Sequence, residues 1–271
     1  MKVFVIDIAK CNGCHNCQVA CKDEHVDNDW LPYAKPQPDT GHFWLKVNEI
    51  VHGQVPKVKI EYVATPCMHC ANAPCIKVAE NGAVYRRDDG LVIIDPEKAK
   101  GQKQIADVCP YGAVYWNEKL EIPQKCTGCV HLPAEGKEPR CVDACPTGAL
   151  LFGDESEFAD LLARAEVLKP EFGLQPRVYY LNVPKLFVAG EIYDPDLDEC
   201  LADVEVTLTD EQSGKVRIER TDEFGDYWFK KLAAGSYTLK VVKEGYKPFE
   251  KNGINVGKSL KMKDIVLTQA K

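Results

Sequence analysis

Apolar and polar residues alternate with a period of two through the last third of the chain. The alternation runs through residues 185–194, 202–210, 215–222, 226–232, 235–242 and 260–267. Glycine, aspartate and proline separate these segments at the spacing of about 8–12 residues that is typical of β-sandwiches and barrels. We therefore predict a separate all-β domain of about seven strands over residues 185–271.

The first 153 residues follow a different pattern, in which short apolar runs stand between cysteines, prolines and turn residues. The runs Lys2–Cys11 and Gly90–Pro96 predict strands, and the first of them leads directly into a cysteine loop. Only brief strands are expected in this half of the chain.

Residues 154–168 predict the clearest helix. Asp154 or Ser156 provides a cap, and apolar residues then recur at helical spacing. These apolar positions are Phe158, Leu161, Leu162, Ala165 and Leu168. We expect a loop over Lys169–Pro184, so that residues 154–184 form a helix and linker between a domain over 1–153 and the β domain.

Composition and charge narrow the class of protein. The 271 residues are 45% hydrophobic and 28% charged, which indicates a folded chain of about two domains. The net charge of −7 and the well-mixed charges give no argument for a nucleic-acid partner. The apolar runs are too short for direct membrane insertion. The opening MKVFVIDIAKC has no export signal, so we expect a cytoplasmic location unless a partner subunit carries that signal.

Cysteine changes this picture most, because twelve of the 13 cysteines precede residue 146. The first run has the spacing C-x2-C-x2-C-x3-C, at Cys11, Cys14, Cys17 and Cys21. Three thiolates at this spacing bind one [4Fe–4S] cubane, and the fourth, on the helix that follows, reaches a second cluster. Zinc is the main alternative, but zinc sites pair two C-x2-C units and rarely use three cysteines in one loop. A disulfide framework would not need this spacing.

The remaining cysteines extend the pattern and leave a gap in it. The last run has the spacing C-x2-C-x11-C-x3-C-P, at Cys126, Cys129, Cys141 and Cys145. The middle run has the spacing C-x2-C-x4-C, at Cys67, Cys70 and Cys75, and Cys109 stands alone before Pro110. The usual spacing would put the missing ligands at Ala79, Ala99, Gln102 and Ile105. These four positions would together hold one cluster, so we infer that one whole cluster has been lost.

Exchange of the fourth cysteine between paired runs assigns the ligands of three clusters. Cluster one takes Cys11, Cys14, Cys17 and Cys145. Cluster two takes Cys126, Cys129, Cys141 and Cys21. Cluster three takes Cys67, Cys70, Cys75 and Cys109. Only Cys200 is left, and we interpret it as a lone thiol near a turn. The predicted fold class is α+β, with two bacterial-ferredoxin-like units followed by the all-β domain.

Other polar and aromatic residues receive weaker interpretations. The histidines near the cysteine runs should surround the clusters or lie on the surface: His15, His25, His69 and His131. Three lysines flank the cluster loops and either raise reduction potentials by their charge or are simply solvated: Lys10, Lys22 and Lys125. We find no catalytic residue, and we expect the aromatic residues of the β domain in its core and at an interface: Tyr227, Trp228 and Phe229.

Two resemblances carry the interpretation further. The order of the runs, the x11 insertion and the repeated CPYGAV and CPTGAL resemble the iron–sulfur subunits of dimethyl-sulfoxide-reductase-type molybdenum enzymes, over about residues 1–185. That stretch includes RVYYLNVPK at Arg177–Lys185. Such subunits usually carry four cubanes, so this chain departs from them by one. The segments TDEFG, LAAGSY and Gly245-Tyr246 resemble carboxypeptidase-regulatory or transthyretin-like domains, which form a sandwich or barrel.

The resemblance implies a non-catalytic electron-transfer subunit in a heterodimer or higher assembly. The partner would be a large catalytic subunit that carries a molybdenum–pterin cofactor. Three clusters with an added β domain resemble the cytoplasmic transhydroxylase branch of the family, whose members act on polyhydroxylated benzenes. The alternatives are a subunit of another molybdopterin reductase or dehydrogenase, a freestanding polyferredoxin-type carrier, and a scaffold with structural clusters.

Overall fold

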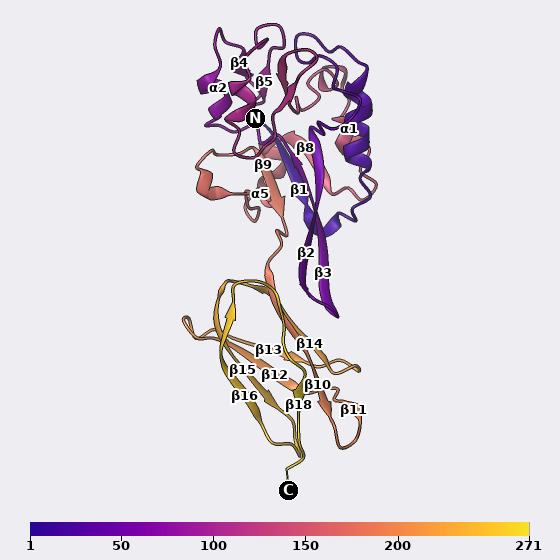
Figure 1. Cartoon of the computed structure of the whole chain (residues 1–271), viewed down its shortest axis with the longest axis vertical. Helices are drawn as coiled ribbons and strands as arrows, with labels where there is room; N and C mark the ends of the chain where they lie inside the picture. Colours follow the sequence, from indigo (N-terminus) through magenta and orange to yellow (C-terminus); the bar gives the residue numbers. More distant parts are fainter. Residues whose placement is uncertain (271) are drawn as a thin grey trace. The chain divides into compact units, whose positions relative to one another are not determined.

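The computed structural model describes residues 1–270, apart from the side chain at position 134 (Figure 1). The chain folds into two compact units. The first comprises Met1–Ile50 with Glu61–Val183, and the second comprises Val51–Ile60 with the chain from Pro184 onward.

A three-stranded sheet joins the two ends of the first unit. Its strands are β1 (Lys2–Asp7), β8 (Leu150–Asp154) and β9 (Val178–Leu181), in the order β8-β1-β9. Strand β8 runs antiparallel to β1 and β9 runs parallel to it. Successive side chains of β1 point to opposite faces, so Phe4 and Ile6 enter the main core while Val3 and Val5 enter a smaller one. The pairing of β1 with β8 puts the start of the first cysteine run beside the end of the last one.

The other elements of the first unit are mostly short. The helices are η1 (Ile8–Lys10), α1 (Asn16–Val26), α2 (Pro74–Val78), α3 (Gln104–Asp107), η2 (Pro133–Glu135), α4 (Arg140–Asp143), η3 (Glu155–Phe158), α5 (Ala159–Leu162) and η4 (Pro170–Phe172). Three two-stranded sheets pair β2 (Leu45–Gln54) with β3 (Lys57–Pro66), β4 (Val84–Arg86) with β5 (Val92–Ile94), and β6 (Tyr115–Asn117) with β7 (Ile122–Gln124). Cysteine side chains take part in the main core of this unit beside aliphatic and aromatic residues.

The helix predicted over 154–168 is shorter than expected. It begins as predicted, because the Glu157 carboxylate accepts a hydrogen bond from the backbone N–H of Asp154 at 2.9 Å. It ends at Leu162, and Glu166 then exchanges two backbone hydrogen bonds with Tyr180, at 2.8 and 2.7 Å. That bridge holds the chain in an extended conformation where the helical pattern predicted another turn.

Two strand regions of the first unit are absent from the sequence-based expectation. The loop prediction over 169–184 is wrong at Val178–Leu181, which forms β9 on the edge of β1. The expectation of brief strands is wrong for the ten-residue strands β2 and β3. The Tyr180 hydroxyl of β9 donates to the carbonyl of Ala64 in β3 at 3.0 Å, so these two regions pack together.

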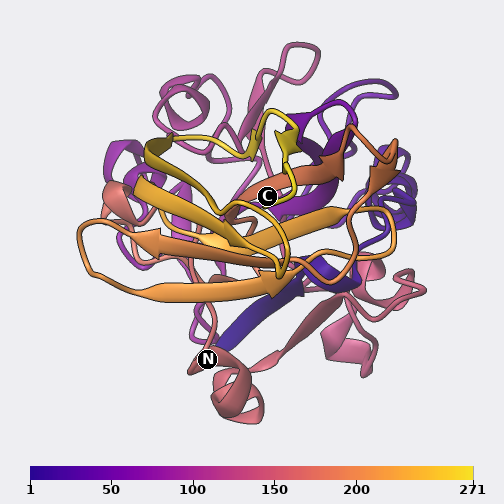
Figure 2. The same cartoon turned by 90° about the horizontal axis from the view of Figure 1, so that it is seen from below.

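The second unit is built around two sheets (Figure 2). The five-stranded sheet contains β10 (Leu186–Asp194), β11 (Glu199–Cys200), β14 (Asp226–Leu232), β17 (Leu260–Lys261) and β18 (Ile265–Val266). The four-stranded sheet contains β13 (Val216–Arg220), β12 (Glu205–Asp210), β15 (Gly235–Val242) and β16 (Phe249–Val256), in that order. Residues of both sheets, such as Ile192 and Leu239, share one core, so the architecture is a sandwich. The strands among the described residues close no barrel.

The period-two pattern locates most of these strands. The bounds of β14 and β15 match the predicted segments, whereas the segment 260–267 is divided between β17 and β18. Strands β11 and β16 were not predicted. Tyr227 and Phe229 are buried in the core as expected, and Trp228 is partly exposed.

No helix in residues 1–270 is both long enough and apolar enough to cross a membrane.

A glycine in the turn before β14 provides the first testable prediction. Gly225 has a φ of +74°, and a Cβ there would lie 2.5 Å from the carbonyl oxygen of Ile192. Gly214 has a similar φ of +69° but no atom within 4 Å of the same position. Gly214→Ala should therefore lower the free energy of unfolding by about 1 kcal/mol through its left-handed backbone alone. Gly225→Ala should lower it by about 1–3 kcal/mol more, because the backbone must also move.

Urea unfolding of the full-length protein measures this difference as a shift in midpoint at constant slope. Equal losses in the two variants would contradict the prediction, since only the close approach to Ile192 distinguishes them.

Candidate iron–sulfur sites

The cysteines predicted for cluster one lie close together at the start of α1 and before β8. Burial raises the pKa of Cys17 to about 12, and the neighbouring thiols of Cys11, Cys145 and Cys14 contribute to that rise. Burial also raises the pKa of Cys11, with added repulsion from Cys145 and Cys14. The backbone N–H of Asp7 donates to the carbonyl of Ala149 at 2.8 Å, which holds the two segments side by side.

The loop before α1 has a conformation that few residue types adopt. Gly13 has a φ of +73°, and a Cβ there would lie 2.7 Å from the ring of Tyr62. His15 then has a φ of 61°, and α1 begins at the next residue. The turn is therefore tight, and Cys17 and Cys21 follow one helical turn apart, both buried.

The cysteines predicted for cluster two lie where α1 meets α4. Burial raises the pKa of Cys21 well above its usual value, and the nearby thiols of Cys126 and Cys129 raise it further. Burial does the same to Cys141, whose pKa is also raised by Cys129, Cys21 and Cys126. Cys17 and Cys21, on consecutive turns of one helix, therefore lie near different thiols for the most part, although both act on Cys141.

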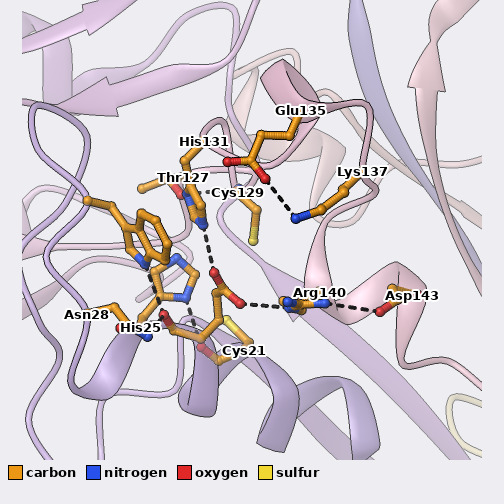
Figure 3. Close-up of polar contacts among 12 residues, drawn as sticks. Cys21, His25, Asn28, Thr127, Cys129, His131, Glu135, Lys137, Arg140 and Asp143 are labelled. Carbon is orange, nitrogen blue, oxygen red and sulfur yellow. Dashed lines mark hydrogen bonds and ion pairs between the residues drawn. The ribbon is translucent and has the colours of Figure 1, made fainter.

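A buried polar cluster, which we call the Glu24 clamp, fixes α1 against the last cysteine run (Figure 3). The Glu24 carboxylate accepts hydrogen bonds from His131 Nε2 at 2.9 Å and from Arg140 Nε at 2.7 Å. The ring of Trp30 stacks on His131 at 3.9 Å, and its Nε1 donates to the Glu24 carbonyl at 3.0 Å. Since His131 follows Cys129 and Arg140 precedes Cys141, the clamp positions Cys21 among its predicted partners.

The charges of the clamp follow from its surroundings. Burial favours the neutral form of Glu24, but hydrogen bonds from Arg140 and His131 outweigh it and hold the pKa below its usual range. Burial lowers the pKa of His25 to about 4, and its Nδ1 donates to the Cys21 carbonyl at 2.9 Å. His25 is therefore neutral and bonded to the backbone of Cys21, and Glu24 is the negatively charged residue of the clamp.

Of the cysteines predicted for cluster three, Cys67 and Cys70 lie between β3 and α2, Cys75 lies in α2, and Cys109 follows α3. Burial raises the pKa of Cys70 to about 12, with added repulsion from Cys67, Cys109 and Cys75. Burial likewise raises the pKa of Cys75 to about 11. Thiols predicted for one cluster therefore lie near one another, and Cys126 also lies near Cys67 of the set predicted for cluster three.

Backbone N–H groups point at several of these sulfur atoms. They donate to Cys67 from His69 at 3.5 Å, to Cys126 from Gly128 at 3.3 Å and to Cys145 from Ala149 at 3.3 Å. For Cys145 such hydrogen bonds, with one from Thr147, overcome the effect of burial and lower the pKa. Amide donors stabilise thiolate sulfur and tune the potential of a cluster bound to it. Buried thiols in fours with amide donors fit the donor set of a [4Fe–4S] cluster.

A site for one metal ion would look different. Within residues 1–270, no three histidine, cysteine, aspartate or glutamate side chains are arranged to hold a single ion. In a cubane each cysteine binds a different iron atom, so its ligands need not converge on one point.

The positions at which the sequence predicts a lost cluster are occupied by packed side chains. Ala99 and Ile105 are fully buried, and Gln102 is nearly so. Gln102 Oε1 accepts from the backbone N–H of Glu80 at 2.8 Å, and its Nε2 donates to the Lys98 carbonyl at 2.8 Å. These bonds put the chain after Ala79 beside the segment before α3, so all four positions lie in one region, as expected from the sequence.

The structure also separates the three lysines. Lys10 is exposed, and Lys22 donates to the carbonyl of Pro38 at 2.8 Å. Lys125 is only 3% exposed, so its interpretation as a solvated lysine is wrong. Cys200 is exposed in the second unit, where its thiol lies 3.5 Å from Glu191 Oε1.

The Glu24 clamp generates the second prediction. Glu24→Gln removes the anion shared by His131 and Arg140, which should weaken the clamp by about 2 kcal/mol. We expect iron and sulfide to be lost several-fold faster in air, because Cys21 is then held less firmly. Glu135→Gln is the matched control, because it breaks an exposed pair with Lys137 in the same region.

Iron and acid-labile sulfide per protein molecule, followed over time, provide the measurement. Identical decay in Glu24→Gln and the parent protein would show that the clamp does not hold the site.

Comparison with known proteins supports these assignments at the level of family. Residues 58–155 match the model of a 4Fe-4S dicluster domain, and residues 188–268 match a carboxypeptidase regulatory-like domain.

The pyrogallol hydroxytransferase small subunit of Pelobacter acidigallici is 41% identical, over 89% of this chain and 90% of its own length. One polypeptide of the anaerobic dimethyl sulfoxide reductase of Escherichia coli is 35% identical, over 64% of this chain and 87% of its own length. One polypeptide of the tetrathionate reductase of Salmonella typhimurium is 34% identical, over 68% of this chain and 74% of its own length. The sequence therefore belongs to the family of iron–sulfur electron-transfer subunits of molybdopterin enzymes.

Proposed function

We propose that this protein binds three [4Fe–4S] clusters and exchanges electrons with a molybdenum–pterin cofactor in a large catalytic subunit. The observation that supports the proposal is the gathering of free cysteines, most of them buried, in the core of the first unit, with backbone N–H groups donating to several of their sulfur atoms. The ligand sets are those inferred above: Cys11, Cys14, Cys17 and Cys145 for cluster one; Cys126, Cys129, Cys141 and Cys21 for cluster two; Cys67, Cys70, Cys75 and Cys109 for cluster three.

The neighbouring groups suggest the order in which electrons pass. Groups one and two share helix α1, where Cys17 and Cys21 are about 6 Å apart along the axis. Groups two and three meet at Cys126, which accepts a hydrogen bond from the backbone N–H of Cys67. This bond opposes the burial that raises the pKa of Cys126 to about 11. A bound [4Fe–4S] cluster supplies a one-electron carrier, and the protein holds three such positions in series.

Group one is the end that we assign to the partner subunit. Cys14 is exposed, and Cys11 and Cys145 are partly exposed, whereas every cysteine of group two is buried. Electrons exchange over short distances, so the most accessible group is the one best placed to face a cofactor in another chain.

The reaction that we propose for the complex is the transfer of hydroxyl groups between polyhydroxylated benzenes. The pyrogallol hydroxytransferase small subunit aligns with 89% of this chain, whereas the dimethyl sulfoxide reductase polypeptide aligns with 64%. Hydroxyl transfer of this kind has no net redox change. The complex therefore needs no complete chain of clusters that leads to an external electron carrier. The filled position at Gln102 is consistent with a protein that buffers electrons. A cytoplasmic location stays a prediction.

Metal and sulfide content test the proposal on protein isolated anaerobically with any large subunit that co-purifies. We expect about twelve irons and twelve sulfides per molecule, with molybdenum in the large subunit. Conversion of pyrogallol to phloroglucinol should accompany it, without consumption of an external reductant. Zinc without sulfide, or about sixteen irons, would overturn the cluster assignment. Reduction of dimethyl sulfoxide or tetrathionate in place of hydroxyl transfer would overturn the proposed reaction.

Removal of single cysteines tests the ligand sets. Cys109→Ala should reduce the iron content from about twelve to about eight, because cluster three loses one of four ligands. Cys200→Ala changes the exposed thiol of the β domain and should leave about twelve irons. Iron and acid-labile sulfide per protein molecule are measured in the two variants to decide whether Cys109 is a cluster ligand. Full iron content in Cys109→Ala would remove this residue from the ligand set.

A further inference from the structure

Lys125 is a buried cation between two groups of thiols. Its side chain is almost inaccessible, and its ammonium donates to the carbonyl oxygens of Val92 and Cys126, the latter at 3.0 Å. In the part of the protein that the structure describes, it forms no ion pair with a carboxylate. Burial of an ammonium group is costly unless its charge is compensated. The surroundings of Lys125 should therefore contain another negative group.

The hydrogen bonds of Lys125 place it between predicted ligands of clusters two and three. It donates to the carbonyl of Cys126, and also to that of Val92, whose N–H donates to His69 in the middle run of cysteines. Burial raises the pKa of Cys75 to about 11, and the positive charge of Lys125 is the largest effect that opposes it. The same charge opposes the burial that raises the pKa of Cys126 and of Cys109. Lys125 thus acts on members of both groups and favours their ionised forms. Neither of its two hydrogen bonds reaches a residue of the set predicted for cluster one.

The position of Lys125 is fixed through strand β5. The carbonyl of Val92 accepts from Lys125, and the N–H of the same residue donates to His69 Nδ1 at 3.0 Å. His69 lies between Cys67 and Cys70 and is 1% exposed. Burial, together with the charge of Lys125, holds the pKa of His69 well below its usual range. Because Nδ1 accepts the N–H of Val92, that nitrogen carries no proton, so the imidazole is neutral and adds no second charge beside the lysine.

Arg86 is the other cation of this region, but its setting differs. It is partly exposed, and it donates to the carbonyls of Cys70 and Ala71 at 2.8 and 2.6 Å. Solvent screens its charge more than it screens that of Lys125.

We propose that Lys125 is the electrostatic partner of clusters two and three and raises their reduction potentials relative to cluster one. This inference rests on the proposed three-cluster assignment. A cubane held by four thiolates is negative, and each added electron increases that charge. A cation fixed nearby in a region of low dielectric constant therefore favours the reduced form. Lys125 would draw electrons inward, away from the exposed group, and so help the protein to store them.

The test uses redox titration of the full-length protein, with any large subunit that co-purifies, followed by electron paramagnetic resonance. Two neutral variants are needed: Lys125→Met keeps the length of the side chain, and Lys125→Gln keeps a hydrogen-bond donor. Lys125→Arg keeps the charge. Lys10→Gln is the matched control, because it removes an exposed lysine next to a ligand of cluster one. Iron and sulfide are counted first in every sample, so that failure of the cluster assignment is recognised separately.

We expect the neutral variants to keep about twelve irons and to lose at least tenfold in the equilibrium constant for reduction of one or two clusters, about 59 mV per electron. Lys125→Arg and Lys10→Gln should leave the potentials within a few-fold of the parent. Loss of cluster iron in both neutral variants, with full iron in Lys125→Arg, would also support the proposal, because charge is what distinguishes them. Unchanged potentials in a fully loaded neutral variant would overturn it. Loss of iron in all three variants would also overturn it, since shape would then matter and charge would not.

Discussion

The structure of the first unit depends on one constraint, which is that the cysteines of each group come from distant parts of the chain. Cys145 must reach the loop that contains Cys11, and Cys21 must reach the run that begins at Cys126. The pairing of β1 with β8 meets the first requirement. The approach of α1 to α4, held by the Glu24 clamp, meets the second. The short helices and loops of this unit bring these cysteines together, and cysteines form part of the core beside apolar residues.

Burial of so many thiols sets the electrostatic character of the unit. Thiols in an apolar environment resist ionisation, as the raised pKa values of Cys21, Cys70 and Cys141 show. Iron must displace their protons, so part of the free energy of cluster binding is spent against this resistance. Backbone N–H groups and the ammonium of Lys125 reduce it. The buried polar groups near the cysteines therefore make sense as compensation for negative charge.

The prediction of the cysteine groups rests on a local signal in the sequence. Ligands that are separated by two residues must lie in the same loop. The exchange of fourth ligands follows from the chemistry of two-cluster ferredoxins. The period-two pattern likewise locates β14 and β15 within a residue. The parts that escape prediction depend on distant partners. Strand β9 is extended because it pairs with β1, and the helix after Asp154 ends where Glu166 meets Tyr180. The burial of Lys125 and the role of Glu24 are also tertiary effects, and a lysine beside a cysteine run gives no sign of them in the sequence.

The hydrogen bonds of Gln102 have a consequence for the history of the protein. Where the sequence predicts a lost cluster, Gln102 joins the backbone at Glu80 to that at Lys98. A return to a cysteine at this position would break those bonds, and a single thiol could not hold iron. Only the simultaneous change of Ala79, Ala99, Gln102 and Ile105 would restore a complete ligand set. A partial set of cysteines here would give up the hydrogen bonds of Gln102 without supplying the four ligands of a cubane, so the described packing and a cluster exclude each other.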